Sequence, residues 1–123
     1  MLAKNAAIYK YLKGLENWIN NFRDSFDIYY LIFGYYTALV RLDIAFEEEQ
    51  KWIFDFLYFV ERELAERNKS KHFGGHIGVM LLIAVDWDKE KSIKLFYELL
   101  DEFVDIYIME NRSGKLVSNI ERP

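Results

Sequence analysis

The chain has no cysteine, a single proline and only six glycines among its 123 residues. Without cysteine it forms neither a disulfide nor a thiolate metal site. So little proline and glycine argues against an all-β chain, which needs many tight turns. A chain without disulfides suits a reducing compartment, and we expect this protein in the cytoplasm.

Long hydrophobic runs are missing as well. The longest uncharged stretches are Ile28–Val40 and His72–Val85. Both are shorter than the roughly 20 apolar residues that a membrane helix needs. The N-terminal stretch lacks the apolar run and small-residue cleavage site of a secretory leader. We therefore expect no contact with a membrane and interpret both stretches as buried helices.

The composition is otherwise that of a globular domain, with 52% hydrophobic and 29% charged residues. Its 22 aromatic residues (10 Phe, 9 Tyr and 3 Trp) exceed what a small core needs, so some aromatic surface should stay exposed. The net charge of −4 is concentrated, since residues 42–66 and 86–110 each carry eight acids against two and three bases. Such a surface argues against direct binding to nucleic acid.

Apolar spacing at helical period predicts an all-α fold, a single domain over residues 1–123 that forms an irregular bundle of about five helices. The expected helices span residues 3–22, 25–42, 43–67, 76–85 and 86–112. Asp24 and Asp43 are the expected caps of the second and third helices, although these two helices are also compatible with one continuous helix. Residues 113–123 should form a loosely ordered tail.

The stretch YELLDEFVD places four carboxylates on one helix face, at i, i+3, i+4 and i+7: Glu98, Asp101, Glu102 and Asp105. Two like-charge pairs four residues apart should each destabilise an isolated helix by roughly 0.2–0.5 kcal/mol. We call these four residues the acidic stripe. It is either a solvated or bridged face, neutralised by Lys and Arg of neighbouring helices, or a docking surface for a basic partner.

Asp55 is a lone carboxylate inside the apolar stretch WIFDFLYFV. Lys51 precedes it by one turn, so a local ion pair at the edge of the helix is the simpler explanation. Alternatively, Asp55 marks a bound ligand or the centre of an interface, flanked by Trp52, Phe56 and Phe59. A helix that is apolar nearly all round is either central in the bundle or has its outer face covered by something else.

Tyrosines occur as two adjacent pairs, Tyr29–Tyr30 and Tyr35–Tyr36. Adjacent helix residues point about 100° apart, so both members of a pair cannot be equally buried. Some of Tyr30, Tyr36 and Tyr58 should therefore reach the surface. There they would serve either as interface anchors or as amphipathic residues at the edge of the core.

Catalytic and metal-binding patterns are weak. His72 and His76 are four residues apart, but two ligands do not make a metal site and Gly74-Gly75 interrupts the helix between them. The stretch GGHIG lacks the strand and the Lys-Ser/Thr of a phosphate loop, and we expect its glycines to let the fourth helix start close against a neighbour. We expect no enzyme activity and no cofactor.

In size, lack of cysteine, acidic helices and aromatic richness the chain resembles helical immunity proteins of bacterial toxin–immunity systems, including contact-dependent inhibition. The stretch GGHIGVMLLIAVDWDKEKSIKLFYELLDEFVD is similar to their paired C-terminal helices. The resemblance implies a small cytoplasmic inhibitor whose partner is a basic toxin domain, for example a nuclease. The acidic stripe would steer the partner, and exposed Tyr and Trp would anchor it.

Two other functions remain open. The first is a bundle that binds an apolar small molecule or a cofactor in a cavity near Trp18, Trp52 and Trp87. The second is a phage-encoded inhibitor of a host defence nuclease, which would use the same acidic surface on a different target. The apolar girth of the third helix also leaves homodimerisation open.

Overall fold

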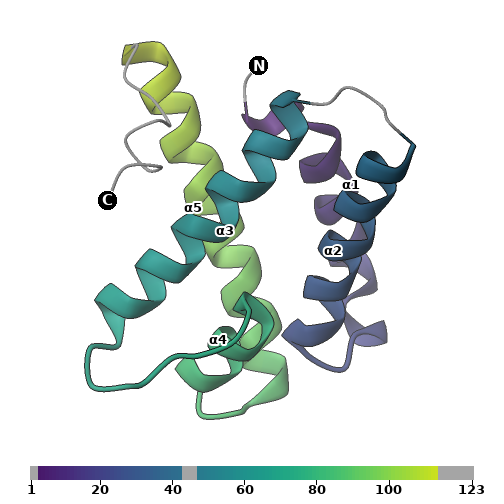
Figure 1. Cartoon of the computed structure of the whole chain (residues 1–123). Helices are drawn as coiled ribbons and strands as arrows, with labels where there is room; N and C mark the ends of the chain where they lie inside the picture. The colour runs from purple at the N-terminus through teal and green to yellow at the C-terminus, as the bar shows by residue number, and fades with distance from the viewer. Residues whose placement is uncertain (1–2, 43–46, 114–123) are drawn as a thin grey trace.

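The computed structural model describes residues 3–42 and 47–113, and within these ranges the fold is all-α, as predicted (Figure 1). Its five α-helices are α1 (Ala7–Leu15), α2 (Ser25–Arg41), α3 (Glu47–Arg67), α4 (Ile77–Ala84) and α5 (Lys89–Ser113). Two 3₁₀ segments, η1 (Ala3–Asn5) and η2 (Glu16–Asn21), flank α1. No helix in the described ranges is long and apolar enough to cross a membrane. The expected cap Asp43 and the tail after Ser113 lie outside the described residues.

The core is built around the crossing of α3 and α5, with α1 and α2 packed along one side and α4 near one end (Figure 1). Phe103 of α5 lies at the centre of this crossing. Its ring centroid is 5.3–5.6 Å from the rings of Trp52, Phe56 and Phe59 on α3. Aromatic pairs at these distances stabilise a core beyond the area that they bury.

Helix α4 packs closely against α2 and α5. Gly78 lies so near α2 that a Cβ at this position would come within 3.2 Å of the Cα of Phe26. The hydroxyl of Ser25 donates to the carbonyl of Gly78 at 2.6 Å, and the backbone N–H of Ser25 donates to the hydroxyl of Ser92 at 3.1 Å. This close approach confirms the expected role of a glycine at the start of the fourth helix.

The first helix ends earlier than its apolar spacing predicts. The expected helix over residues 3–22 is wrong, because α1 stops at Leu15 and the chain is non-helical at Trp18 (φ −107°, ψ 20°). The hydroxyl of Tyr97 donates to the carbonyl of Leu12 at 2.8 Å. In a continuing α-helix this carbonyl would accept from the N–H of Glu16, which instead bonds to the carbonyl of Lys13.

The start of the last helix also differs from the prediction, since α5 begins at Lys89 rather than at residue 86. Asp86 and Trp87 have φ of 55° and 65°. These values lie in the left-handed region, so neither residue can be part of a right-handed α-helix. The carboxylate of Asp88 accepts from the N–H of Lys91 at 3.0 Å and so caps α5. The predicted cap of α2 is confirmed, because the carboxylate of Asp24 accepts from the N–H of Phe26 at 2.9 Å.

Helix α1 is capped by a carboxylate from another helix. Its own N-cap residue, Ala6, offers no side-chain acceptor. The buried carboxylate of Glu49 on α3 instead accepts from the N–H groups of Ala7 and Ile8 at 3.2 and 3.0 Å, and from the hydroxyl of Tyr35 at 3.2 Å. Burial and the Glu49 carboxylate raise the pKa of Tyr35 to about 12. Glu49 therefore joins α1, α2 and α3 through one side chain.

We expect Glu49→Ala to lower the free energy of unfolding by roughly 2–4 kcal/mol, because it leaves two backbone N–H groups and a hydroxyl without their acceptor. Glu49→Gln keeps one acceptor oxygen and should lose less. The exposed neighbour Glu48 provides the control variant Glu48→Ala. Chemical denaturation of the three variants measures the effect. Equal losses for Glu49→Ala and Glu48→Ala would contradict the capping role.

Candidate functional site

Neighbouring helices neutralise half of the acidic stripe. The carboxylate of Asp101 lies 3.2 Å from the ammonium of Lys13 on α1. Glu102 pairs with the guanidinium of Arg67 at the end of α3, which also contacts Glu63. Glu98 and Asp105 are exposed, and neither forms an ion pair with another described residue. The stripe is thus partly bridged within the fold and partly open to solvent.

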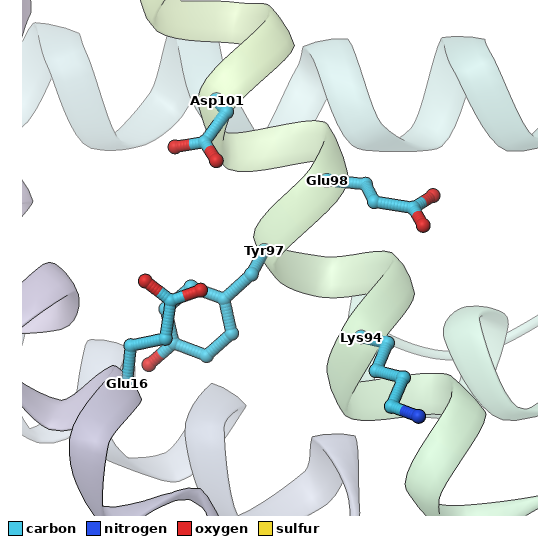
Figure 2. Close-up of a pocket in the computed structure, with 5 residues that line it drawn as sticks. All are labelled: Glu16, Lys94, Tyr97, Glu98 and Asp101. Atoms are coloured by element: carbon cyan, nitrogen blue, oxygen red, sulfur yellow. The ribbon is translucent and has the colours of Figure 1, made fainter.

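A shallow groove of about 260 Å³ lies beside the stripe, between η2 and α5 (Figure 2). It is lined by Glu16, Lys94, Tyr97, Glu98 and Asp101. Figure 2 shows Tyr97 and Asp101 on the side of α5 that faces Glu16, whereas Glu98 and Lys94 extend from its other side. The groove and its rim are therefore mostly acidic.

Lys13 forms ion pairs with two of the carboxylates that line this groove. Its ammonium lies 2.7 Å from the carboxylate of Glu16 and 3.2 Å from that of Asp101. The hydrogen bond to Glu16 raises the pKa of Lys13, which keeps this ammonium charged. Three carboxylates (Glu16, Glu98 and Asp101) and two ammonium groups (Lys13 and Lys94) lie at this groove, so its local charge is −1.

A second concave surface, which we call the aromatic groove, lies between α2 and α3. It has a volume of about 180 Å³ and is lined by Tyr29, Ile32, Phe33, Tyr36, Ile53, Phe54 and Leu57. The rings of Tyr36 and Phe54 meet across it at 5.3 Å. Its rim is unusually exposed, with Phe33 at 54%, Phe54 at 53% and the adjacent Tyr30 at 58%. The expectation that part of the aromatic surface stays uncovered is confirmed.

The aromatic groove and the acidic stripe lie on opposite sides of the α3–α5 pair. Trp52 and Phe56 of α3 pack against Phe103. Phe54, two residues from each, is rotated about 160° away from both. On α5, Asp101 and Asp105 are likewise two residues from Phe103 and face away from α3. Figures 1 and 2 view this helix pair from its two opposite sides, because α3 lies in front of α5 in Figure 1 and behind it in Figure 2.

The other residues predicted for the site are distributed unevenly. Tyr36 lines the aromatic groove and Tyr30 is exposed beside it, whereas Tyr58 is half-buried on the side of α3 that carries Phe54. Asp55 is only 2% exposed, and its carboxylate lies 3.7 Å from the ammonium of Lys51. The expected ion pair is confirmed. Asp55 contributes no surface to either groove.

His76 caps α4 and supports one end of the aromatic groove. Its Nδ1 accepts from the N–H of Gly78 at 3.0 Å. Its ring stacks on that of Tyr29 at 3.9 Å and 2°, and meets the edge of Phe26 at 4.8 Å. The predicted start of the fourth helix at His76 is therefore confirmed. In the described residues, no three His, Asp or Glu side chains are grouped so as to hold a metal ion.

The three tryptophans differ in exposure, and they line neither of the two grooves described above. Trp52 is fully buried in the core, whereas Trp18 and Trp87 are 62% and 59% exposed. The cavity near these three residues that the small-molecule hypothesis expects stays a prediction.

Sequence reasoning missed three residues of these surfaces. Phe33 and Phe54 line the aromatic groove, and helical spacing gives a signal for Phe54, which falls between the buried positions of α3. Glu16 had no such signal, because its place beside α5 depends on the early end of α1. Comparison of the chain with protein-family models, with curated proteins and with solved structures found no match.

We expect His76 to make the stability of the fold depend on pH. Burial lowers the pKa of His76 below its usual 6.5, so folding favours the neutral ring. This contribution is complete above pH 6.5 and is lost as the pH falls through 6.5 toward the folded-state pKa. Protonation also removes the acceptor for Gly78, since a charged imidazole has only donors.

The measurement compares unfolding midpoints at about pH 7.5 and about pH 5.5. The wild type should lose more stability than His76→Asn, whose side chain still caps the helix but does not titrate. His72→Asn, at an exposed loop position, is the matched control. If His76→Asn loses as much as the wild type over this range, His76 is not the group responsible.

Proposed function

We propose that this chain is a small acidic inhibitor that binds a basic protein through the solvent-exposed face of α5. In its most specific form it is an immunity protein that neutralises a basic toxin domain, such as a nuclease. One observation carries the proposal: Glu98 and Asp105 are exposed and form no ion pair with another described residue, although they belong to a stripe of four like charges.

Glu98 and Asp105 contribute little to the stability of the fold. Glu98 repels Glu102 one turn on, and Asp105 repels Asp101 one turn back. Lys13 and Arg67 bridge Asp101 and Glu102 but leave the other two exposed. A binding partner that brings its own cations would give Glu98 and Asp105 a favourable interaction that the described fold does not supply.

A surface of this kind suits inhibition of an enzyme that acts on nucleic acid. Such an enzyme needs cationic side chains to hold phosphate groups. Carboxylates pair well with the same guanidinium and ammonium groups, so an acidic helix competes directly for the substrate surface. The groove that Glu16 and Asp101 border provides an adjacent place for one basic side chain. A phage-encoded inhibitor of a defence nuclease would act through the same contacts.

The two halves of the stripe allow a matched test. Glu98→Gln/Asp105→Asn removes the exposed pair and should leave the fold as stable as the wild type, or slightly more stable, because repulsion falls. Asp101→Asn/Glu102→Gln removes the bridged pair and should cost up to about 1 kcal/mol. Thermal and chemical unfolding distinguish the two double variants, which make the same change in charge.

Binding is tested with purified products of the neighbouring genes, beginning with those whose sequences are basic. At low salt, Glu98→Gln/Asp105→Asn should slow association by roughly tenfold, and added salt should remove the difference. The purified wild-type chain should also inhibit the activity of the product that it binds. Equal association rates for the wild type and the Glu98→Gln/Asp105→Asn variant at low salt would refute the proposed role of α5.

A further inference from the structure

The acidic side of the molecule also contains a tyrosine, Tyr9 of α1, which is half-buried. Tyr9, Lys13 and Glu16 are spaced at i, i+4 and i+7, so they share one side of α1 and its C-terminal cap. This side borders α5, because Lys13 binds Asp101. Glu16, one turn away from Lys13, lines the groove beside Glu98. The two helices therefore run antiparallel where they meet.

This packing brings Tyr9 close to the C-terminal end of the acidic stripe. One further turn of α1 leads from Lys13 to Tyr9. The matching turn of α5 leads from Asp101 to Asp105. Burial raises the pKa of Tyr9, and Lys13 lowers it. The carboxylates of Asp101 and Asp105 raise it further, so the Tyr9 hydroxyl is within electrostatic reach of both.

The fold already holds one cation between a tyrosine ring and a carboxylate on this surface. The ammonium of Lys13 lies 5.9 Å from the centroid of the Tyr97 ring and 3.2 Å from the carboxylate of Asp101. A cation in this position is attracted both by the ring and by the carboxylate. Tyr9 and Asp105, one turn further along both helices, repeat this pairing. Asp105 is exposed and forms no ion pair with another described residue, so a cation from a partner has access to it.

The cation that suits this position best is the guanidinium of an arginine. A guanidinium is planar, so it stacks on an aromatic ring while two of its N–H groups donate to a carboxylate. It is also more weakly hydrated than the ammonium of a lysine, and it therefore loses less when it leaves water. The half-buried ring of Tyr9 keeps water away from one side of such a contact, which strengthens the attraction between ring and cation.

We propose that Tyr9 makes the acidic surface selective for arginine: an arginine side chain of the partner lies over the Tyr9 ring and pairs with Asp105. This inference rests on the proposed function, because it concerns the same partner and the same stripe. It adds that the partner presents an arginine next to α1. A lysine in its place would keep the charge but lose the stacked, bidentate contact.

Two peptides of equal length and charge, hexa-arginine and hexa-lysine, test this selectivity by calorimetric titration of the whole chain at low salt. The wild type should bind hexa-arginine more tightly than hexa-lysine by roughly fivefold to tenfold. Tyr9→Leu should remove most of this difference, because leucine has no ring, whereas Tyr9→Phe should keep it. Tyr30→Leu, at an exposed tyrosine on the aromatic side, is the matched control and should bind both peptides as the wild type does.

A second measurement uses the wild type alone, so it does not depend on the stability of the variants. In NMR spectra of the complex with hexa-arginine, nuclear Overhauser effects should connect the δ-methylene protons of an arginine with the ring protons of Tyr9. The same protons should shift upfield, because they lie over an aromatic ring. Absence of both signals in a complex that does form would overturn the stacked contact.

The titrations separate the role of Tyr9 from the proposed function. Equal affinity of the wild type for the two peptides would overturn the role of Tyr9, as would a preference for arginine that Tyr9→Leu leaves unchanged. The role of α5 would still stand if Glu98→Gln/Asp105→Asn weakens the binding of both peptides. If this double variant binds both peptides as tightly as the wild type, the proposed function fails as well.

Discussion

The contact of Phe103 with α3 determines where both surfaces of this molecule lie. Its ring packs against Trp52, Phe56 and Phe59, and it holds the middle of α5 against the middle of α3. Each of the two helices is thereby left with one open side. On α5 that side carries the acidic stripe, and on α3 it carries Phe54. The two surfaces are separated because the same ring defines the inner face of both helices.

Peripheral elements then shape each surface. On the acidic side, the early end of α1 places Glu16 beside α5, and Lys13 joins it to Asp101. On the aromatic side, α2 supplies the second wall of the groove, and its end near α4 is fixed by the stacking of His76 on Tyr29. Glu49 connects the two regions, since it caps α1 and also binds Tyr35 of α2.

Much of this fold follows from the sequence because its helices are long and their apolar spacing is regular. The second and third helices and the cap Asp24 depend on local patterns, which the structure confirms. The errors arise where a distant group overrides a local pattern. The hydroxyl of Tyr97 donates to the carbonyl of Leu12, where α1 ends. No local pattern predicts this hydrogen bond, because the two residues are 85 positions apart in the sequence.

The candidate site was predictable to a smaller degree. Helical spacing places the four carboxylates of the stripe on one face, but it does not reveal that Lys13 and Arg67 reach two of them. Spacing also does not show on which side of the molecule the exposed tyrosines lie. The sequence hypothesis joined acids and aromatic anchors in one interface, whereas the packing around Phe103 places them on opposite sides. This separation is why the proposed binding surface contains the acids and not the aromatic groove.

The assignment of binding to the acidic side is tested most directly by amide NMR spectra of the wild type titrated with a purified basic partner. Shifts and broadening should be concentrated in residues 94–105 of α5. Amides of residues 27–41 and 53–58, on the aromatic side, should keep their positions. Changes confined to residues 27–41 and 53–58 would contradict the account, because the aromatic side would then be the contact with the partner.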